Sequence, residues 1–126
     1  MTKYTESRVF TDNDLDSFIN LSDDQALFHS SKEYAKSSGF VDRICHGVMT
    51  LMPVSKILGE IIPGEGYVIL EIRAKFNKPI YPGYKVNYHA ELKSENKELG
   101  IATVHIQWEN ESEEKLGSTT AICKKI

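Results

Sequence analysis

Residues 46 to about 60 place the strongest constraint on the fold, because apolar side chains would occur on every side of the helix that they form. These side chains belong to Val48, Met49, Leu51, Met52, Val54, Ile57 and Leu58. A helix that is apolar on all faces must be covered on all faces. Pro53 lies inside the segment, so we expect one lost backbone hydrogen bond and a kink near Met49.

From Tyr67 onward the hydrophobic period changes from that of a helix to that of β-strands. The first strand is predicted to face the core with Val68, Leu70, Ile72, Ala74 and Phe76. Three more alternating segments follow, over residues 86–92, 102–108 and 116–124, with Cys123 on the same face as Ala121. Residues 4–10 can add a fifth strand. The sequence therefore predicts an α+β fold, with a curled antiparallel sheet wrapped around one long helix.

The N-terminal third of the chain has the pattern of two short helices. Thr11 and Asp14 have the spacing of a capping box, and apolar residues follow at helical spacing, which predicts a helix over residues 12–20. A second helix is expected over residues 32–38, ending before Gly39. Residues 24–29 would then form a loop between the two helices. Reactive groups are often carried on such loops.

Length and composition limit the possible classes of protein. A chain of 126 residues is expected to be a single domain over residues 1–126. Its formal net charge of −3 argues against a nucleic-acid partner, and it contains no apolar run long enough to span a membrane. The polar N-terminal residues lack the apolar core of a signal peptide. Two cysteines in no metal or redox spacing indicate reduced thiols and a cytoplasmic location.

The candidate reactive groups are Asp24, His29 and the backbone N–H of Gly47. A carboxylate and an imidazole that share one water molecule form a proton-transfer pair. A glycine N–H at the start of a helix can polarise a carbonyl oxygen. Together these groups could add water across an activated double bond or remove it. We expect Ser22 to anchor the Asp24 segment and His46 to support the loop.

These residues resemble the signature of the MaoC-like (R)-specific enoyl-thioester hydratases. The family pattern reads approximately Ser-Gly-Asp-x-Asn-Pro-x-His, followed by a position near Phe-Gly and then by Ile-x-His-Gly-Met. The residues on this pattern are Ser22, Asp24, His29, Phe40, Ile44, His46 and Gly47, with Met49 one position beyond the family's Met. Residues 76–83 are similar to the family's Phe-x-x-Pro-x-x-x-Gly turn. Four positions differ from the pattern: Asp23 replaces Gly, Ala26 replaces Asn, Leu27 replaces Pro, and Ser31 replaces a common Asp.

The resemblance implies a hot-dog fold, a homodimer or larger homo-oligomer, and the reversible hydration of a trans-2-enoyl thioester to the (R)-3-hydroxyacyl thioester. The thioester would be carried by coenzyme A or acyl carrier protein. It implies catalytic roles for Asp24, His29 and Gly47, and substrate contacts from Ser22, Phe40, His46 and Met49. The reaction class requires no cofactor and no metal.

Two other functions stay open at this point. A hot-dog thioesterase would use a carboxylate to activate water against the thioester carbonyl carbon. A non-catalytic acyl-thioester-binding or assembly subunit would keep the fold while its loop changed, and Ala26 and Leu27 favour this reading. The spacing of Asp24, His29 and His46-Gly47 favours the hydratase.

Overall fold

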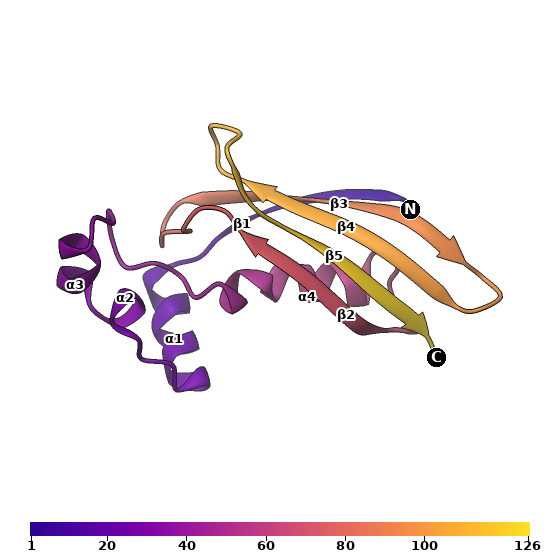
Figure 1. Ribbon diagram of the computed structural model, residues 1–126, viewed down its shortest axis with the longest axis horizontal. Helices are drawn as coiled ribbons and strands as arrows, with labels where there is room; N and C mark the ends of the chain where they lie inside the picture. The colour runs from indigo at the N-terminus through magenta and orange to yellow at the C-terminus, as the bar shows by residue number, and fades with distance from the viewer.

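The computed structural model describes residues 1–126 and contains one five-stranded antiparallel sheet and a set of helices (Figure 1). The elements, in chain order, are β1 (Lys3–Val9), α1 (Asp12–Ser22), α2 (Leu27–Ser30), α3 (Lys32–Ser37), the 3₁₀ helix η1 (Val48–Leu51), α4 (Met52–Glu60), β2 (Tyr67–Phe76), β3 (Lys85–Asn96), β4 (Ile101–Glu109) and β5 (Lys115–Lys125). The strand order is β1-β3-β4-β5-β2. Figure 1 shows α4 running along the sheet, whereas α1, α2 and α3 gather at one end of the molecule.

The strands β3 and β4 follow the predicted alternation, whereas β5 does so only from Thr119 onward because residues 116–119 are all buried; the apolar face of the three strands forms the core with α4. The buried residues of this face are Val86, Tyr88, Ala90, Ala102, Val104, Ile106, Trp108, Ala121 and Cys123. Val54, Ile57 and Leu58 of α4 belong to the same hydrophobic cluster. β1 pairs with the edge of β3 that is not bonded to β4, which confirms the fifth strand predicted over residues 4–10. The predicted α+β arrangement of a sheet around a central helix is therefore confirmed.

The alternation predicted for β2 is wrong in its first half. A β-bulge at Leu70 shifts the register between Ile69 and Glu71, so Ile69 rather than Val68 lies on the face of Cys123. β2 is also an edge strand, and Val68, Leu70 and Phe76 are 46%, 59% and 50% exposed. A bulge reverses the faces of all residues on one side of it. The strand therefore presents apolar side chains that this chain alone does not cover.

The predicted central helix is present as two consecutive segments, η1 and α4. Pro53 lies in the first turn of α4, where an N–H has no helical partner. It therefore does not interrupt the helix, contrary to the prediction. The segment is also not covered on every side, because Val48 and Met52 are exposed. Lys56, on the polar side, forms an ion pair of 3.0 Å with Glu6 of β1. Burial is thus confined to the face that contacts the sheet.

The capping box at the start of α1 is formed as predicted. The Asp14 N–H donates to Thr11 Oγ1 at 3.0 Å, and the Thr11 N–H donates to Asp14 Oδ2 at 3.0 Å. The bond from the Thr11 N–H lowers the pKa of Asp14. The helix ends at Ser22, two residues later than residue 20, and Asp23 terminates it in the left-handed region with φ 64°. The expected loop over residues 24–29 is partly helical, because His29 lies on α2.

None of the helices is both long enough and apolar enough to cross a membrane.

A substitution at Gly117 tests the packing between β4 and β5. A Cβ atom there would lie 2.6 Å from two atoms of the Trp108 indole and 2.7 Å from the Lys75 carbonyl oxygen. We expect Gly117→Ala to lower the free energy of unfolding by about 1–3 kcal/mol through overpacking. Gly59→Ala is the matched control, because nothing lies within 4 Å of its Cβ position on α4, and alanine should stabilise the helix by about 0.5–1 kcal/mol. Urea unfolding measures both, and equal effects would contradict the packing described.

Candidate functional site

Two segments that are distant in sequence meet at the N-terminal end of the helical run. The first contains Ser22, Asp24 and His29, and the second contains Ile44 and His46. The Asp24 N–H donates to Ser22 Oγ at 3.1 Å, which is the local hydrogen bond expected of Ser22. The Asp24 carboxylate accepts from the Ala26 N–H at 3.1 Å. These two bonds fix the backbone and the side chain of Asp24 before the start of α2.

His29 has a defined tautomer in its neutral form. Its Nδ1 lies 2.6 Å from the carbonyl oxygen of Ile44. A carbonyl oxygen can only accept, so Nδ1 must carry the hydrogen. Nε2 of the neutral ring then keeps its lone pair and is free to accept a proton. This is the state that a general base requires.

His46 holds the first segment in place from within the core. It is 2% exposed, and its Nε2 donates to the carbonyl oxygen of Asp24 at 3.0 Å. Its ring stacks on that of His29, with 3.8 Å between the ring centroids and an angle of 20° between the planes. Phe18 of α1 also contacts the His46 ring, with 4.8 Å between the ring centroids. Each histidine therefore donates to a backbone carbonyl of the other's segment.

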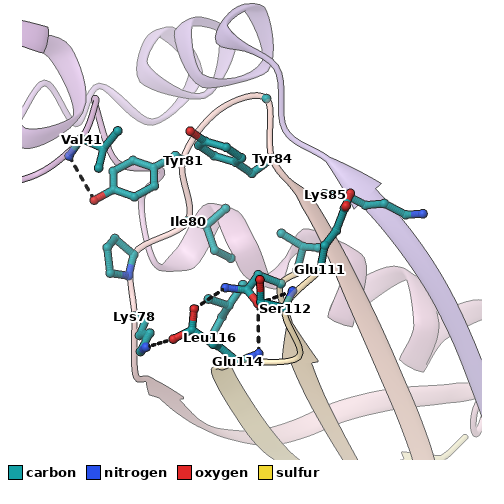
Figure 2. Close-up of a pocket in the computed structure, with 14 residues that line it drawn as sticks. Val41, Lys78, Ile80, Tyr81, Tyr84, Lys85, Glu111, Ser112, Glu114 and Leu116 are labelled. Atoms are coloured by element: carbon teal, nitrogen blue, oxygen red, sulfur yellow. Dashed lines mark hydrogen bonds and ion pairs between the residues drawn. The ribbon is translucent and has the colours of Figure 1, made fainter.

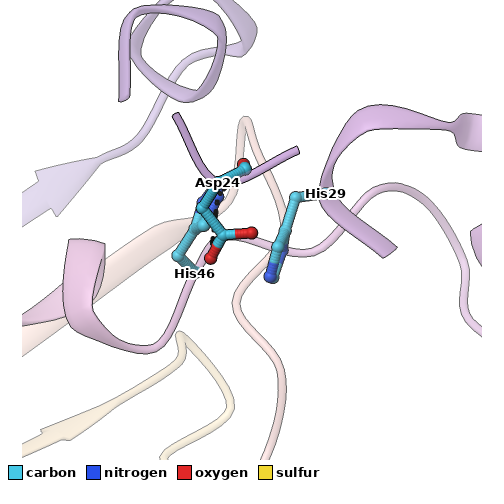
Figure 3. A group of neighbouring side chains, drawn as sticks. All are labelled: Asp24, His29 and His46. Atoms are coloured by element: carbon cyan, nitrogen blue, oxygen red, sulfur yellow. Dashed lines mark hydrogen bonds and ion pairs between the residues drawn. The ribbon is translucent and has the colours of Figure 1, made fainter. Parts of the chain in front are cut away.

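Asp24, His29 and His46 form one cluster, shown in Figure 3. The candidate ligand atoms of the three side chains all lie within 4.8 Å of one another, and Asp24 Oδ2 is 3.9 Å from His46 Nε2. Stacked parallel imidazoles direct their in-plane lone pairs along separate lines, which is unfavourable for binding one ion. The Nε2 of His46 is also engaged with Asp24. The geometry therefore favours proton transfer between Asp24 and His29 over metal binding.

Arg43 connects the cluster to α1. Its guanidinium donates to Asp16 at 2.7 Å and to Asp12 at 3.2 Å, and both acids lie on α1. The same group reaches the carbonyl oxygen of His29 at 3.4 Å. The Arg43 side chain is 15% exposed, so its charge is largely removed from water and is compensated by the two carboxylates. Arg43 thus joins α1, α2 and the segment that leads to Gly47.

Gly47 precedes η1, and its N–H donates to no acceptor within the chain. The ring of Phe76 lies 3.2–3.3 Å from the position that a Gly47 Cβ would occupy. A larger residue would therefore push this ring away. The free N–H and the absence of a side chain leave the start of the helical run open to a ligand oxygen.

A cavity of about 380 Å³ adjoins these groups. It is lined by His29, Phe40, Ile44, Cys45, Gly47, Thr50, Phe76, Asn77, Lys78, Pro79, Ile80, Trp108 and Leu116. Burial raises the pKa of the Cys45 thiol to about 12, so this thiol is neutral and unreactive at physiological pH. Among the predicted contacts, Phe40 lines the cavity, whereas Met49 is fully buried in the core. Ser22, Asp24 and His46 are not among the residues that line the cavity, and the roles predicted for these residues and for Met49 stay predictions.

Several cavity residues were not predicted from the sequence. Phe76 was assigned to the core but is half-exposed over Gly47. Trp108 is core-facing by alternation and is buried, but it also lines the cavity, as does the buried Leu116, whose burial alternation did not predict. The similarity of residues 76–83 to a family turn was the available signal. That turn is attached to the site because the Cys45 N–H donates to the Ile80 carbonyl oxygen at 2.8 Å.

Comparison with known proteins places the chain in a family. Residues 2–115 match the model of the MaoC like domain. The chain belongs to the MaoC-like family. The (R)-specific enoyl-CoA hydratase of Rhodospirillum rubrum is 30% identical over 77 residues, which cover 61% of this chain and 54% of that protein. The mitochondrial 3-hydroxyacyl-[acyl-carrier-protein] dehydratase of Arabidopsis thaliana is 30% identical over 81 residues, or 64% of this chain and 48% of that protein. The chain thus spans about half the length of these two relatives.

Solved structures support the fold assignment. The (R)-hydratase from A. caviae involved in PHA biosynthesis superimposes with a TM-score of 0.91 at 24% identity, covering 98% of this chain and 94% of that one. The ChsH1–ChsH2 complex from Mycobacterium tuberculosis gives a TM-score of 0.86 at 16% identity, covering 100% of this chain and 98% of the matched one. Identities this low establish the fold alone. The MaoC-like chain has the hot-dog fold that its sequence predicted.

The four departures from the MaoC-like pattern fall at helix ends. Asp23 occupies a left-handed position, where the family's glycine would be free of strain. Ala26 is the N-cap of α2 and supplies no side-chain bond, and Leu27 is its first residue, a position that proline favours. Ser31 is the N-cap of α3 and accepts from the Tyr34 N–H at 3.1 Å, as an aspartate could. Three of the four changes therefore weaken or alter helix termini, whereas Asp24, His29 and Gly47 match the pattern.

A second cavity, of about 500 Å³, borders the first (Figure 2). The residues lining both cavities are Lys78, Pro79, Ile80 and Leu116. Figure 2 shows Ile80 pointing into the second cavity, and the Tyr81 hydroxyl accepts from the Val41 N–H at 3.3 Å. Lys78 pairs with Glu114, so its charge is compensated. This cavity contains neither the histidines nor Gly47, and the smaller cavity is therefore the candidate active site of the MaoC-like chain.

The missing cap of α2 leads to a testable difference. The N–H groups of Leu27 and Phe28 donate to no acceptor in the chain, so an asparagine at position 26 can accept one of them. We expect Ala26→Asn to raise the free energy of unfolding by about 0.5–2 kcal/mol. Ser31→Ala removes the existing cap of α3 and should lower it by a similar amount, about 1 kcal/mol. Denaturant unfolding compares the two, and no gain from Ala26→Asn would refute the missing cap.

Proposed function

We propose that this protein is a hydro-lyase that hydrates a trans-2-enoyl thioester to the (R)-3-hydroxyacyl thioester, or catalyses the reverse dehydration. One observation carries the proposal: His29 donates through Nδ1 to Ile44, so its free Nε2 lies in a cluster with the Asp24 carboxylate, at a cavity that is also lined by Gly47, whose N–H has no acceptor in the chain. A proton acceptor, a carboxylate and an oxyanion donor around one cavity are what the reaction needs.

In the hydration direction, Asp24 and His29 hold one water molecule over the β-carbon of the substrate. The water oxygen bonds to this carbon while the pair removes a proton, and the electrons of the double bond shift toward the thioester oxygen. The pair then returns the proton to the α-carbon. Water is consumed as hydroxyl and hydrogen, and no redox partner is involved. Because the two groups are so close, they act as one coupled acid–base unit.

Gly47 supplies the donor for the thioester oxygen. Its N–H has no acceptor in the chain and begins the helical run formed by η1 and α4. The positive end of a helix dipole stabilises negative charge that develops there. The ring of Phe76 packs against Gly47 on its side-chain position. In this scheme His46 positions Asp24 through its backbone and does not react.

The relatives support this reaction class and leave the carrier open. The Rhodospirillum protein is named an (R)-specific enoyl-CoA hydratase, and the Arabidopsis protein a 3-hydroxyacyl-[acyl-carrier-protein] dehydratase. Both names describe the interconversion of an enoyl thioester and a 3-hydroxyacyl thioester, on coenzyme A in the first protein and on acyl carrier protein in the second. We assign the thioester substrate to this chain and either carrier to the thioester. Both cysteines are free and buried, which agrees with a reducing compartment such as the cytoplasm.

We also propose that the protein forms a homodimer through β2. One edge of this ten-residue strand pairs with β5 and the other is unpaired, and the side chains of Val68 and Leu70 on this strand are exposed. An unpaired edge with exposed apolar residues is a template for strand addition. A second copy meets the same edge across a two-fold axis and satisfies both edges at once. Pairing in this way would extend the sheet across two copies of the chain.

The reaction is tested by the loss of enoyl absorbance of crotonyl-CoA. Asp24→Asn keeps an acceptor for the Ala26 N–H, and His29→Asn keeps a donor near the position of Nδ1, so both variants should fold. We expect each to lower kcat/KM by about 10²–10⁴-fold, because each removes one half of the proton-transfer pair. Glu98→Gln and His105→Ala, far from the cavity, are matched controls that should retain activity.

Three outcomes would count against this assignment. Turnover that survives both substitutions would overturn the roles of Asp24 and His29. Release of free thiol from saturated acyl-CoA by the wild type would favour the thioesterase. Binding of crotonyl-CoA without hydration or thiol release would favour the non-catalytic acyl-thioester subunit.

The dimer is tested by sedimentation equilibrium. The chain has a mass of 14.3 kDa, and the wild type should sediment at about twice that value. Leu70→Lys places a charge on the proposed interface and should yield the monomer. Leu99→Lys introduces the same change at an equally exposed leucine, 61% against 59%, away from β2, and should stay dimeric. A monomeric wild type, or a dimeric Leu70→Lys, would contradict the β2 interface.

A further inference from the structure

Four residues lie side by side in one row across the sheet. Tyr88 of β3 pairs with Trp108 of β4, Trp108 pairs with Gly117 of β5, and Gly117 pairs with Phe76 of β2. Directly opposed residues in antiparallel strands point to the same face. This face is the one that packs against the helical run, because Tyr88 and Trp108 belong to the core cluster. We call these four residues the aromatic row.

Gly117 has no side chain and leaves a gap in the aromatic row, and the Trp108 indole occupies this gap. A Gly117 Cβ would lie 2.6 Å from two indole atoms, so the ring rests directly over the glycine. On its other side the indole packs on Tyr88, with 5.4 Å between ring centroids. The Tyr88 hydroxyl donates to the carbonyl oxygen of Thr50 at 2.7 Å and fixes this neighbour in turn. The indole is therefore held from both sides and has one position.

The candidate active-site cavity reaches from the reacting groups to this indole. At its outer end lies Phe76, which is 50% exposed and contacts Gly47. We call the part lined by its buried side chains, Trp108, Leu116 and Ile80, the inner end; these are 1%, 5% and 5% exposed, and Leu116 and Ile80 also border the second cavity. Gly47 and these buried side chains line the same cavity, so a thioester held at the Gly47 N–H can place its acyl chain against them. The indole is the largest of the three buried side chains that the acyl chain would meet there.

We propose that Trp108 is a specificity-determining residue that closes the inner end of the cavity and restricts the protein to short acyl chains. This inference rests on the proposed acyl-thioester function. Gly117 contributes to the same restriction, because it provides the recess that lets the indole lie flat across the sheet. A smaller residue at position 108 opens apolar space beyond the cavity. Apolar space of this kind stays dry and accepts apolar ligands.

The test measures binding separately from turnover. Dissociation constants of butyryl-CoA and octanoyl-CoA, which are saturated and cannot be hydrated, are determined by calorimetry. Their pantetheine arm is the part shared by both candidate carriers. We expect the wild type to prefer butyryl-CoA by at least about tenfold. In Trp108→Leu the octanoyl-CoA affinity should rise until the preference is lost or reversed. The ratio of kcat/KM for trans-2-octenoyl-CoA and crotonyl-CoA should shift in the same direction.

Two further variants separate the role in specificity from a general loss of packing. Trp108→Phe removes less of the buried side chain and keeps the protein folded if Trp108→Leu does not, and it should give a smaller shift in the same direction. Ile106→Ala removes buried volume from the same face of β4 without touching the cavity, so the ratio of the two affinities should not change.

The possible failures are distinguishable. An affinity ratio that is equal in the wild type and in a folded Trp108 variant overturns the role of Trp108, whatever the reaction. Wild-type binding of octanoyl-CoA as tight as that of butyryl-CoA overturns this role as well. If the ratio shifts as expected but crotonyl-CoA is not hydrated, the acyl site and its length limit stand and the hydro-lyase proposal fails. If neither thioester binds, both proposals fail.

Discussion

The geometry of the site depends on a pair of reciprocal hydrogen bonds between two histidines and two backbone carbonyls. His29 donates to the carbonyl oxygen of Ile44, and His46 donates to that of Asp24. Each imidazole thus fixes the segment that carries the other, and the rings stack between them. The Ile44 N–H closes the same junction by donating to the Phe28 carbonyl oxygen at 3.0 Å. The orientation of Asp24 and His29 and the position of the entrance to the helical run follow from this one junction.

Features that depend on neighbours in sequence were predictable. The capping box of α1 requires groups only three residues apart, and the alternation of β3, β4 and the second half of β5 follows from strands with one buried face. Asp24, His29 and Gly47 could be named as candidates because the motif contains them in two short segments, residues 22–29 and 44–47. The sequence could not show that His29 is on a helix, since α2 is a single turn without a cap and lacks any strong helical signal.

Features that depend on strand register were not predictable. The bulge at Leu70 reverses the faces of β2, and no residue type marks it. Pro53 predicted a kink because the hydrophobic pattern does not show the change from η1 to α4 just before this residue. The contact between Trp108 and Gly117 exists because β4 and β5 pair in one register. Alternation correctly assigned Trp108 to the core, but the boundary between core and cavity is set by these non-local contacts.

The changes at positions 26 and 27 bear on whether the chain keeps a working site. Asparagine and proline there would stabilise the start of α2 through its N-cap and first residue. In this chain the direction of the His29 ring is fixed by other means, namely its bond to Ile44 and its stacking on His46. Asp24 is held by Ser22 and by the Ala26 N–H, and both contacts are independent of the side chain at position 26. The altered helix start therefore reduces the stability of α2 more than the alignment of the reacting groups, which favours a catalytic reading of the site over a purely structural one.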